Sequence, residues 1–338
     1  MLKELEQRKD ELQGAPLASV YFGGGTPSVL SPKELTSFFE HIHRFFNLVP
    51  NAEITLEANP EDMDVEQLAL WRQLGINRLS IGLQSFNEAE LTWMNRKHSA
   101  TDSVNAVKRA QDAGFRNLSI DLIYGSKFLD LSAWQKSLET ALSLNTSHIS
   151  AYNLTIEPKT VLGLKNSRGQ EPAVNDEHSA AQFLWMSEFL TANGFLHYEI
   201  SNFGKVGYTA VHNSNYWQQV PYLGIGPSAH SYDGNTRRWN VANNQKYLKA
   251  LEEGLPYFET ELLHTKDRYN EYIMTGLRTI WGCDTAFIEK EFGMEVLAHF
   301  HQSVLPIKKH FQMEQGVYSL LKESRLLADG LAADLFMD

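Results

Sequence analysis

A glycine loop near the N-terminus has the composition of a ligand-binding turn. The apolar run Leu17–Phe22 reads as a strand, and residues 23–27, Gly-Gly-Gly-Thr-Pro, follow it directly. Glycine has no Cβ and tolerates positive φ, so such a loop can bring bare backbone against a bound group. The loop is neither the dinucleotide fingerprint nor a P-loop, because no G-K-[ST] sequence follows. A sharp turn that only glycine can make is the alternative explanation.

Polar residues also follow the later predicted strands, which we expect over residues 52–56, 78–83, 117–122 and 148–154. The residues at these strand ends are Glu57, Gln84, Asp121, Asn153 and Thr155. In a parallel β/α barrel the carboxyl ends of the strands form the rim on which the active site is built. Ordinary helix capping is the alternative, but polar residues at the ends of several strands in succession favour a site at this rim.

The elements that would position these residues alternate regularly between strand and helix. Helical segments are expected over residues 32–46, 65–74, 100–113 and 131–144, each between two strands, with a further helix over 176–193. Five βα units in succession predict a parallel barrel or a doubly wound sheet. A segment over 195–204, a loop-rich lobe over 206–239 and a helix over 247–254 follow.

The C-terminal part has a different pattern, and we place a domain boundary within residues 256–263. Residues 1–255 are expected to form the β/α unit with its loop-rich lobe, and residues 256–338 a separate module. Helical periodicity over 268–280 and 296–310 precedes short segments at 317–321, 325–328 and 331–336. Helices followed by a small hairpin predict a winged-helix-like module. A simple helical cap is the alternative.

Composition excludes several classes of protein. The 338 residues carry a formal net charge of -11, which argues against a broad nucleic-acid footprint. No apolar run is long enough for a bilayer span, and residues 1–14 form a charged helix without a signal-peptide core, so we expect a cytoplasmic protein. Cys283 is the single cysteine, so no disulfide can form within the chain and no site can use cysteine alone to bind a metal.

Eight short motifs occur along the chain in a characteristic order. They are Gly-Gly-Gly-Thr-Pro at 23–27, Glu-Ala-Asn-Pro at 57–60, Gly-Leu-Gln-Ser-Phe at 82–86, Asn95-Arg96, Ile-Asp-Leu-Ile-Tyr-Gly at 120–125, the segment 198–203, the cluster 212–217, and Tyr-Leu-Gly-Ile-Gly at 222–226. Together these motifs resemble the oxygen-independent coproporphyrinogen III oxidase branch of the radical S-adenosylmethionine (radical SAM) superfamily. Within that branch, the last three motifs look most like the HemW-type haem chaperones.

The resemblance implies a binding site for S-adenosylmethionine at the strand ends. Gly24 and Gly25 would offer backbone to the methionyl amino group, and Thr26 with Pro27 would fix the loop. Arg96 would pair with the methionyl carboxylate, a role that suits its planar fork of donors. The other implied contacts are Gln84 and Asp121 to the ribose hydroxyls, Ile123 beside the adenine, and Glu57 in the polar wall.

The iron–sulfur motif of the superfamily is missing from the sequence. Members use three cysteines spaced C-x-x-x-C-x-x-C, located before the glycine loop, to hold a [4Fe–4S] cluster. Here only one helical segment precedes that loop, and Cys283 belongs to the C-terminal module. We therefore expect an N-terminally truncated copy of a longer protein, with a partial β/α barrel that lacks its first strand. Loss of redox chemistry is the alternative, and this chain is not expected to be catalytically active as written.

Residues 212–217, His-Asn-Ser-Asn-Tyr-Trp, correspond to the HNxxYW signature that is associated with haem binding in HemW-like proteins. The resemblance implies haem contacts by His212, Asn213, Tyr216 and Trp217, with His212 as a possible iron ligand. A neutral imidazole is a natural axial ligand, and aromatic rings can stack on a porphyrin. A histidine packed within a loop core is the alternative. His197 and His230 are weaker candidates and are expected to be structural.

Three functions follow from these expectations. The first is a haem chaperone that binds haem and passes it to an acceptor protein. The second is an oxygen-independent coproporphyrinogen III oxidase, which would decarboxylate coproporphyrinogen III to protoporphyrinogen IX with S-adenosylmethionine. The third is a barrel hydrolase with Glu57 and Asp121 as acid and base, which the glycine loop, Gln84 and Arg96 disfavour.

Overall fold

The computed structural model describes residues 1–337, and the chain forms two compact units. The barrel unit comprises Ser19–Pro32 and Glu53–Ala210. The discontinuous unit comprises Met1–Ala18, Lys33–Ala52 and Val211–Asp338. The chain thus passes between the units within its first 53 residues and again after Ala210. The predicted boundary between residues 255 and 256 is not one of these crossing points, and it stays a prediction.

A seven-stranded sheet forms the centre of the barrel unit, and the predicted α/β partial barrel is confirmed. Strands β2 to β5 pair in parallel, whereas β7 pairs antiparallel with both β5 and β6. The order is β1-β2-β3-β4-β5-β7-β6. The strands are β1 (Leu17–Phe22), β2 (Leu48–Ala58), β3 (Arg78–Gln84), β4 (Asn117–Tyr124), β5 (His148–Asn153), β6 (Phe195–Glu199) and β7 (Asn202–Lys205).

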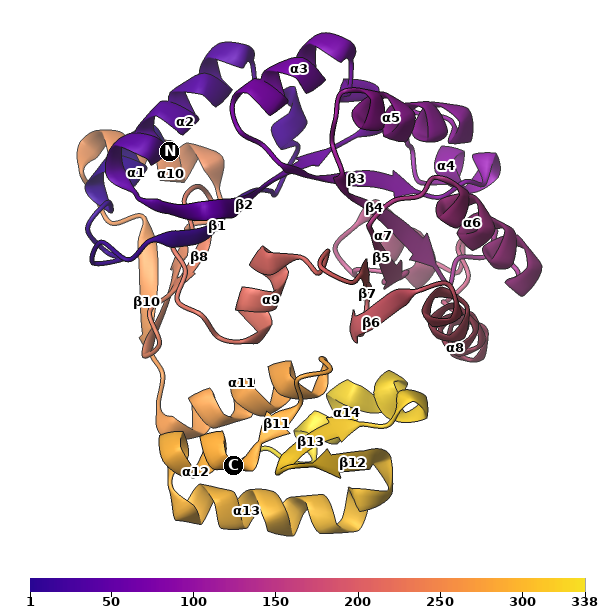
Figure 1. The fold of residues 1–338 in the computed structure, drawn as a ribbon, viewed down its shortest axis with the longest axis vertical. Coiled ribbons are helices and arrows are strands. Elements are labelled where there is room, and N and C mark those ends of the chain that lie inside the picture. The colour runs from indigo at the N-terminus through magenta and orange to yellow at the C-terminus, as the bar shows by residue number, and fades with distance from the viewer. Residues whose placement is uncertain (338) are drawn as a thin grey trace. The chain divides into compact units, whose positions relative to one another are not determined.

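Helices alternate with the strands as the sequence pattern predicts. Figure 1 shows α3, α5, α6 and α8 along the outer face of the curved sheet. Side chains of Asp64, Ser99, Asp130 and Asn175 accept hydrogen bonds from backbone N–H groups at the starts of these four helices, which explains where each begins. The helices are α2 (Pro32–Phe45), α3 (Val65–Gln73), α4 (Glu88–Trp93), α5 (Ala100–Asp112), α6 (Leu131–Ser143), α7 (Val161–Ser167) and α8 (Asp176–Ala192).

The two faces of the central strands have opposite character, because successive strand residues point to opposite sides. One set is apolar and has no solvent exposure: Leu56, Leu79, Ile81, Leu83, Ile120 and Leu122. The alternate set is polar although it is also buried: Glu53, Thr55, Arg78, Ser80, Ser119, His148 and Ser150. A polar interior of this kind can carry a site, whereas the apolar face packs as a core.

The discontinuous unit contains two small sheets. The first has the order β10-β9-β8 and is antiparallel throughout. It is joined by the N-terminal helix, which spans Leu2–Gln7 and is therefore much shorter than the predicted 1–14. The elements of this part are α1 (Leu2–Gln7), α9 (Val211–Trp217), β8 (His230–Tyr232), β9 (Thr236–Asn240), α10 (Asn244–Glu253) and β10 (Phe258–Leu262).

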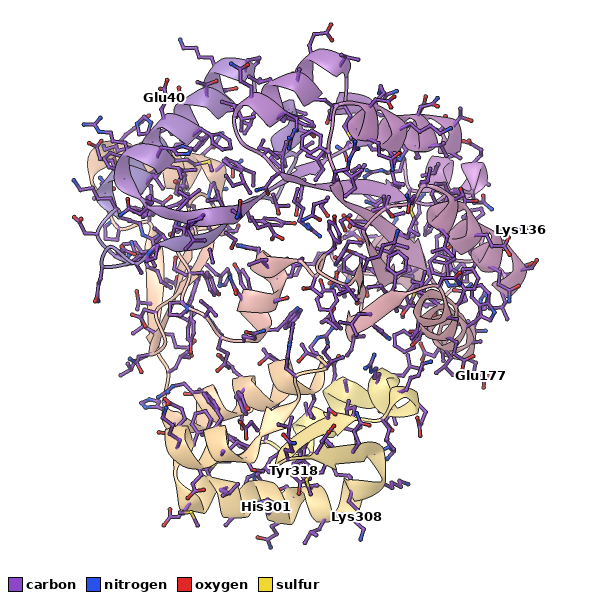
Figure 2. All side chains as sticks on the ribbon, viewed as in Figure 1. Glu40, Lys136, Glu177, His301, Lys308 and Tyr318 are labelled. Carbon is purple, nitrogen blue, oxygen red and sulfur yellow. The ribbon has the colours of Figure 1, made fainter. Side chains whose placement is uncertain are left out.

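The second small sheet lies in the C-terminal part, among helices (Figure 1). Its order is β11-β13-β12, and the predicted hairpin is the β12–β13 pair. Tyr318 on β13 packs edge-on against Phe300 and His301, the second of which is labelled beside it in Figure 2. The elements are α11 (Thr265–Leu277), β11 (Cys283–Asp284), α12 (Thr285–Phe292), α13 (Met294–Val304), β12 (Phe311–Glu314), β13 (Val317–Leu320) and α14 (Ala328–Ala333).

Some predicted bounds need correction. Strand β2 begins at Leu48, four residues before the prediction, because two further apolar residues extend its pattern. The segment 325–328 lies in a short 3-10 turn and at the start of α14, and the first half of 331–336 lies in α14, so neither segment belongs to the hairpin. Across residues 1–337, every helix is too short or too polar to span a bilayer.

Candidate functional site

The glycine loop after β1 is shaped by two of its glycines and by a carboxylate. Gly24 and Gly25 have φ values of 75° and 65°, in the left-handed region that favours glycine. Gly23 is required for space, since a Cβ there would lie 2.3 Å from the Tyr21 ring and 2.9 Å from Glu57 Oε1. The loop therefore depends on all three glycines, as the sequence suggests.

Glu57, at the end of β2, fixes this loop. Its Oε1 accepts a hydrogen bond of 2.7 Å from the Tyr21 hydroxyl, and its Oε2 accepts one of 3.1 Å from the backbone N–H of Gly24. The Gly24 N–H is thus engaged within the protein, so a ligand would meet the remaining backbone groups of the loop. Thr26 precedes a short 3-10 helix, Pro27–Val29, which continues the loop.

Arg96 presents an unused donor beside the end of β3. Its Nη2 donates to Asn59 Oδ1 at 2.8 Å and to the Gly82 carbonyl at 3.1 Å. Its Nε is buried and has no hydrogen-bond partner among the described residues. A buried guanidinium N–H without an acceptor costs free energy, and a ligand carboxylate would satisfy it.

Three polar side chains lie around a small gap at Gly82. A Cβ at Gly82 would lie 2.8 Å from Gln84 Nε2, 3.5 Å from Arg96 Nη2 and 3.7 Å from Asn59 Oδ1. Gln84 itself has a φ of 66°, which is unusual for a residue other than glycine. Such backbone strain often occurs where a side chain is held for a ligand.

Asp121 on β4 lies deeper within the polar face. Ser80 Oγ donates to its two carboxylate oxygens at 3.2 and 3.3 Å. Although the residue keeps some solvent exposure, desolvation of the carboxyl raises its pKa to about 6, against the opposing effects of Arg78 and of hydrogen bonds from Ser150 and Ser80. Ile123 follows two residues later on the same face of the strand.

The strand ends therefore offer hydrogen-bond donors and acceptors that suit a ligand with a zwitterionic amino-acid group and a pair of neighbouring hydroxyl groups. Arg96 can meet a carboxylate, and Gln84 with Asp121 can meet hydroxyl groups. Register pairs Glu57 with Ser80, and Ser80 bonds Asp121, so the two carboxylates lie on β2 and β4, on either side of β3. Four further residues hold these strand ends and have no role in the sequence prediction: Tyr21, Asn59, Ser80 and His98. Ser80 could have been found, because it alternates with Gly82 and Gln84 along β3.

The segment with the predicted haem contacts forms helix α9. His212 and Tyr216, four residues apart, share one helix face with ring centroids 5.2 Å apart, and Tyr216 packs on Tyr222 at 4.2 Å. Tyr216 is 41% exposed. The Trp217 ring lies under the Arg278 guanidinium at 5.3 Å, and its buried Nε1 has no hydrogen-bond partner among residues 1–337.

The two weaker histidine candidates have different surroundings. The His197 ring nitrogens lie 2.9 Å from Ser187 Oγ and 2.9 Å from the Ile200 carbonyl, and the ring stacks on Phe203. His197 is thus engaged in the core of the barrel unit. His230 is exposed and stacks on Trp239 at 6.3 Å.

The residues present do not fit a [4Fe–4S] cluster. Cys283 is fully buried, and desolvation raises the pKa of its thiol well above the ordinary value, so it stays protonated. Across the described chain, the His, Cys, Asp and Glu side chains nowhere gather in a group of three or more that could hold a metal ion.

Comparison with known proteins gives three consistent findings. The family model of the radical SAM superfamily matches residues 2–141. The heme chaperone HemW of Bacillus subtilis is 35% identical over 281 residues, which cover 82% of this chain and 74% of the relative. HemW of Haemophilus influenzae is 30% identical over 318 residues, covering 93% and 81%.

Among solved structures, coproporphyrinogen III oxidase (HemN) from Escherichia coli, described as a radical SAM enzyme, has a TM-score of 0.84. The alignment covers 99% of this chain and 81% of that one, at 21% sequence identity. At that identity the likeness establishes the fold.

Proposed function

We propose that this chain, which belongs to the HemW-like family of radical SAM proteins, is a haem chaperone that binds haem at α9 and releases it to an acceptor protein. The observation that carries the proposal is the array of His212, Tyr216 and Tyr222 on and beside that helix. It combines an imidazole with two aromatic rings, which is the chemistry that a haem iron and a porphyrin face require.

The side chains of α9 would contact different parts of the haem. The imidazole of His212 would bind the iron, and Tyr216 with Tyr222 would cover the porphyrin. Burial raises the pKa of Tyr216 well above its ordinary value, so the phenol stays neutral and presents an uncharged face. The unpartnered Nε1–H of Trp217 offers a donor to a polar group, and Asn213 adds an amide.

S-adenosylmethionine is proposed as the ligand of the strand ends in the barrel unit. Two observations support it: the orphaned Nε of Arg96 and the gap at Gly82 that a Cβ would fill. Arg96 would bind the methionyl carboxylate, and Gly24, Gly25 and Thr26 would line the methionyl group. Gln84 and Asp121 would hold the ribose, with Ile123 beside the adenine. Bound S-adenosylmethionine would supply a sulfonium group and an adenosyl group there.

The oxidase alternative depends on a [4Fe–4S] cluster that the residues of this chain do not fit. The hydrolase alternative needs a free carboxylate pair, whereas Glu57 is engaged by Tyr21 and by the glycine loop. Cytoplasmic location and the transfer of haem to an acceptor protein stay predictions.

A chaperone must hold haem reversibly, and a transfer experiment tests this. We expect apomyoglobin, added in excess to the haem-loaded chain, to take up the haem completely, as followed in the Soret band. His212→Ala should release its haem faster, because an iron ligand is lost, whereas His43→Ala should release it at the wild-type rate, since His43 bonds only its own helix. Haem that stays with the wild-type chain would contradict a transfer function.

A further inference from the structure

We propose that His98 is a positioning residue for the S-adenosylmethionine site and acts as a protonated clamp between two strand ends. The inference rests on the proposed binding of S-adenosylmethionine. The His98 side chain has no solvent exposure. Its Nδ1 lies 2.9 Å from Glu61 Oε2, and its Nε2 lies 3.1 Å from the backbone carbonyl of Leu83.

Both atoms that contact the His98 ring are acceptors. A backbone carbonyl cannot donate a hydrogen bond, so Nε2 must carry a proton. Desolvation opposes ionisation of Glu61, but hydrogen bonds from its own backbone N–H and from His98 outweigh it and lower the pKa of Glu61. A glutamate with an ordinary or lowered pKa is ionised at neutral pH, so Glu61 can only accept, and Nδ1 must also carry a proton. The geometry thus holds the ring as an imidazolium.

The charged groups around this ring come from three elements. Glu61 belongs to the 3-10 turn η2 (Pro60–Asp62), and Asp102 and Arg109 belong to α5. Arg96 lies in the same loop as His98 and acts on Glu61 electrostatically. The carboxylates of Glu61 and Asp102 thus favour the imidazolium, and the direct contact is the one with Glu61 at 2.9 Å.

The clamp fixes two neighbours of the proposed ligand contacts. Leu83, whose carbonyl it binds, directly precedes Gln84, the residue with a φ of 66°. Glu61 follows two residues after Asn59, which accepts from Arg96 Nη2. One ring therefore ties the end of β3 to the turn after β2 and holds both the strained Gln84 and the partner of Arg96. Loss of either proton would release one of these two ends.

Nitrogen NMR of the wild-type protein tests the protonation directly. With histidine labelled by ¹⁵N at both ring positions and His98 assigned by comparison with His98→Gln, we expect both His98 nitrogens to show shifts of the protonated type at neutral pH. A ring nitrogen with the shift of an unprotonated imidazole at that pH would overturn the clamp. This readout does not depend on S-adenosylmethionine.

Calorimetric titration with S-adenosylmethionine tests the positioning role. The His98→Gln affinity should be weaker by about tenfold, because a charged hydrogen bond is lost. His41→Gln is the control, since the His41 ring contacts the carbonyl of Ser37 within its own helix, and should bind like the wild type.

The outcomes separate the two proposals. Wild-type affinity in His98→Gln would overturn the clamp and leave the S-adenosylmethionine site standing. A wild-type chain that does not bind S-adenosylmethionine would overturn the site and with it the positioning role, whatever the NMR shows of the ring.

Discussion

At the scale of single residues, desolvation and hydrogen bonding give the acidic groups of the barrel unit different properties. The pKa of Asp121 is raised to about 6, chiefly by desolvation. The pKa of Glu61 is lowered, because hydrogen bonds outweigh desolvation there. The two carboxylates thus differ in the pH at which they ionise, although both lie beside the same proposed site.

The raised pKa of Asp121 predicts a pH dependence of S-adenosylmethionine binding. Below about pH 6 the carboxyl is protonated and is a poorer acceptor for ribose hydroxyls, so the affinity should rise as pH increases through this value. Calorimetric titrations across this range, with Asp121→Asn and Asp130→Asn in parallel, measure it. Asp121→Asn should lose the rise, whereas Asp130, an exposed N-cap of α6, should not affect it. A wild-type profile that is flat through pH 6 would contradict this assignment.

The sequence identifies candidate ligand contacts more readily than it identifies the residues that hold them in place. Gly24, Gly25 and Arg96 are recognisable from the family motifs. Their supports are not, because hydrogen bonds join residues far apart in the chain: Tyr21 reaches Glu57 and Ser80 reaches Asp121, over 36 and 41 positions. Local periodicity does not predict such pairs, because they form only through the register between strands.

At the scale of elements, the short helix α1 is anchored by a buried carboxylate. Glu4 has no solvent exposure and accepts hydrogen bonds from Arg8, the Gly226 N–H, Asn240 and Tyr247, at 2.5 to 3.0 Å. These partners come from the C-cap of α1, the loop after α9, β9 and α10. Glu4 therefore joins the N-terminal helix to the small sheet of the discontinuous unit.

Removing this anchor should destabilise the discontinuous unit. Glu4→Ala leaves the Arg8 guanidinium, only 2% exposed, without one of its carboxylate partners, and we expect a loss of about 3 to 5 kcal/mol in the free energy of unfolding. Urea denaturation measures the loss. The exposed Glu6 on the same helix provides the control, and Glu6→Ala should change the unfolding free energy by under about 0.5 kcal/mol. Equal stability of both variants would show that Glu4 is not an anchor.

The βα rhythm predicts most elements of the barrel unit within a few residues, because apolar periodicity and N-caps such as Asp64 and Ser99 are local signals. Prediction is poorer for α1 and for the C-terminal segments after residue 321. There the charged, Leu-spaced pattern suits a longer helix than Leu2–Gln7, and short apolar segments do not distinguish a strand from the helix α14.

At the scale of the whole molecule, the chain combines a confirmed family fold with a cysteine content that does not fit the family's iron–sulfur cluster. The single cysteine is buried in β11, and its Sγ lies 4.0 Å from the Ile273 carbonyl. The resemblance to HemW-type proteins is confirmed by the relatives, whereas the site residues stay predictions. Sequence motifs identified the family because they cover both units.

Reconstitution with iron and sulfide should therefore leave this chain without a stoichiometric cluster. We expect the iron and sulfide content after desalting to be far below four of each per chain, and to be the same in Cys283→Ser. Chemical analysis measures the iron and sulfide content, and the visible absorbance of thiolate-to-iron charge transfer shows whether a cluster has formed. A stoichiometric cluster that disappears in Cys283→Ser would contradict this prediction, because it would need further ligands that the structure does not bring together around Cys283.

The measurement that tests the central proposal most directly is a haemin titration followed in the Soret region. We expect the wild type to bind one haem per chain saturably, His212→Ala to bind at least about tenfold more weakly because the iron ligand is lost, and His230→Ala to bind like the wild type. Unsaturable binding by the wild type, or equal binding by all three proteins, would contradict a haem site on α9.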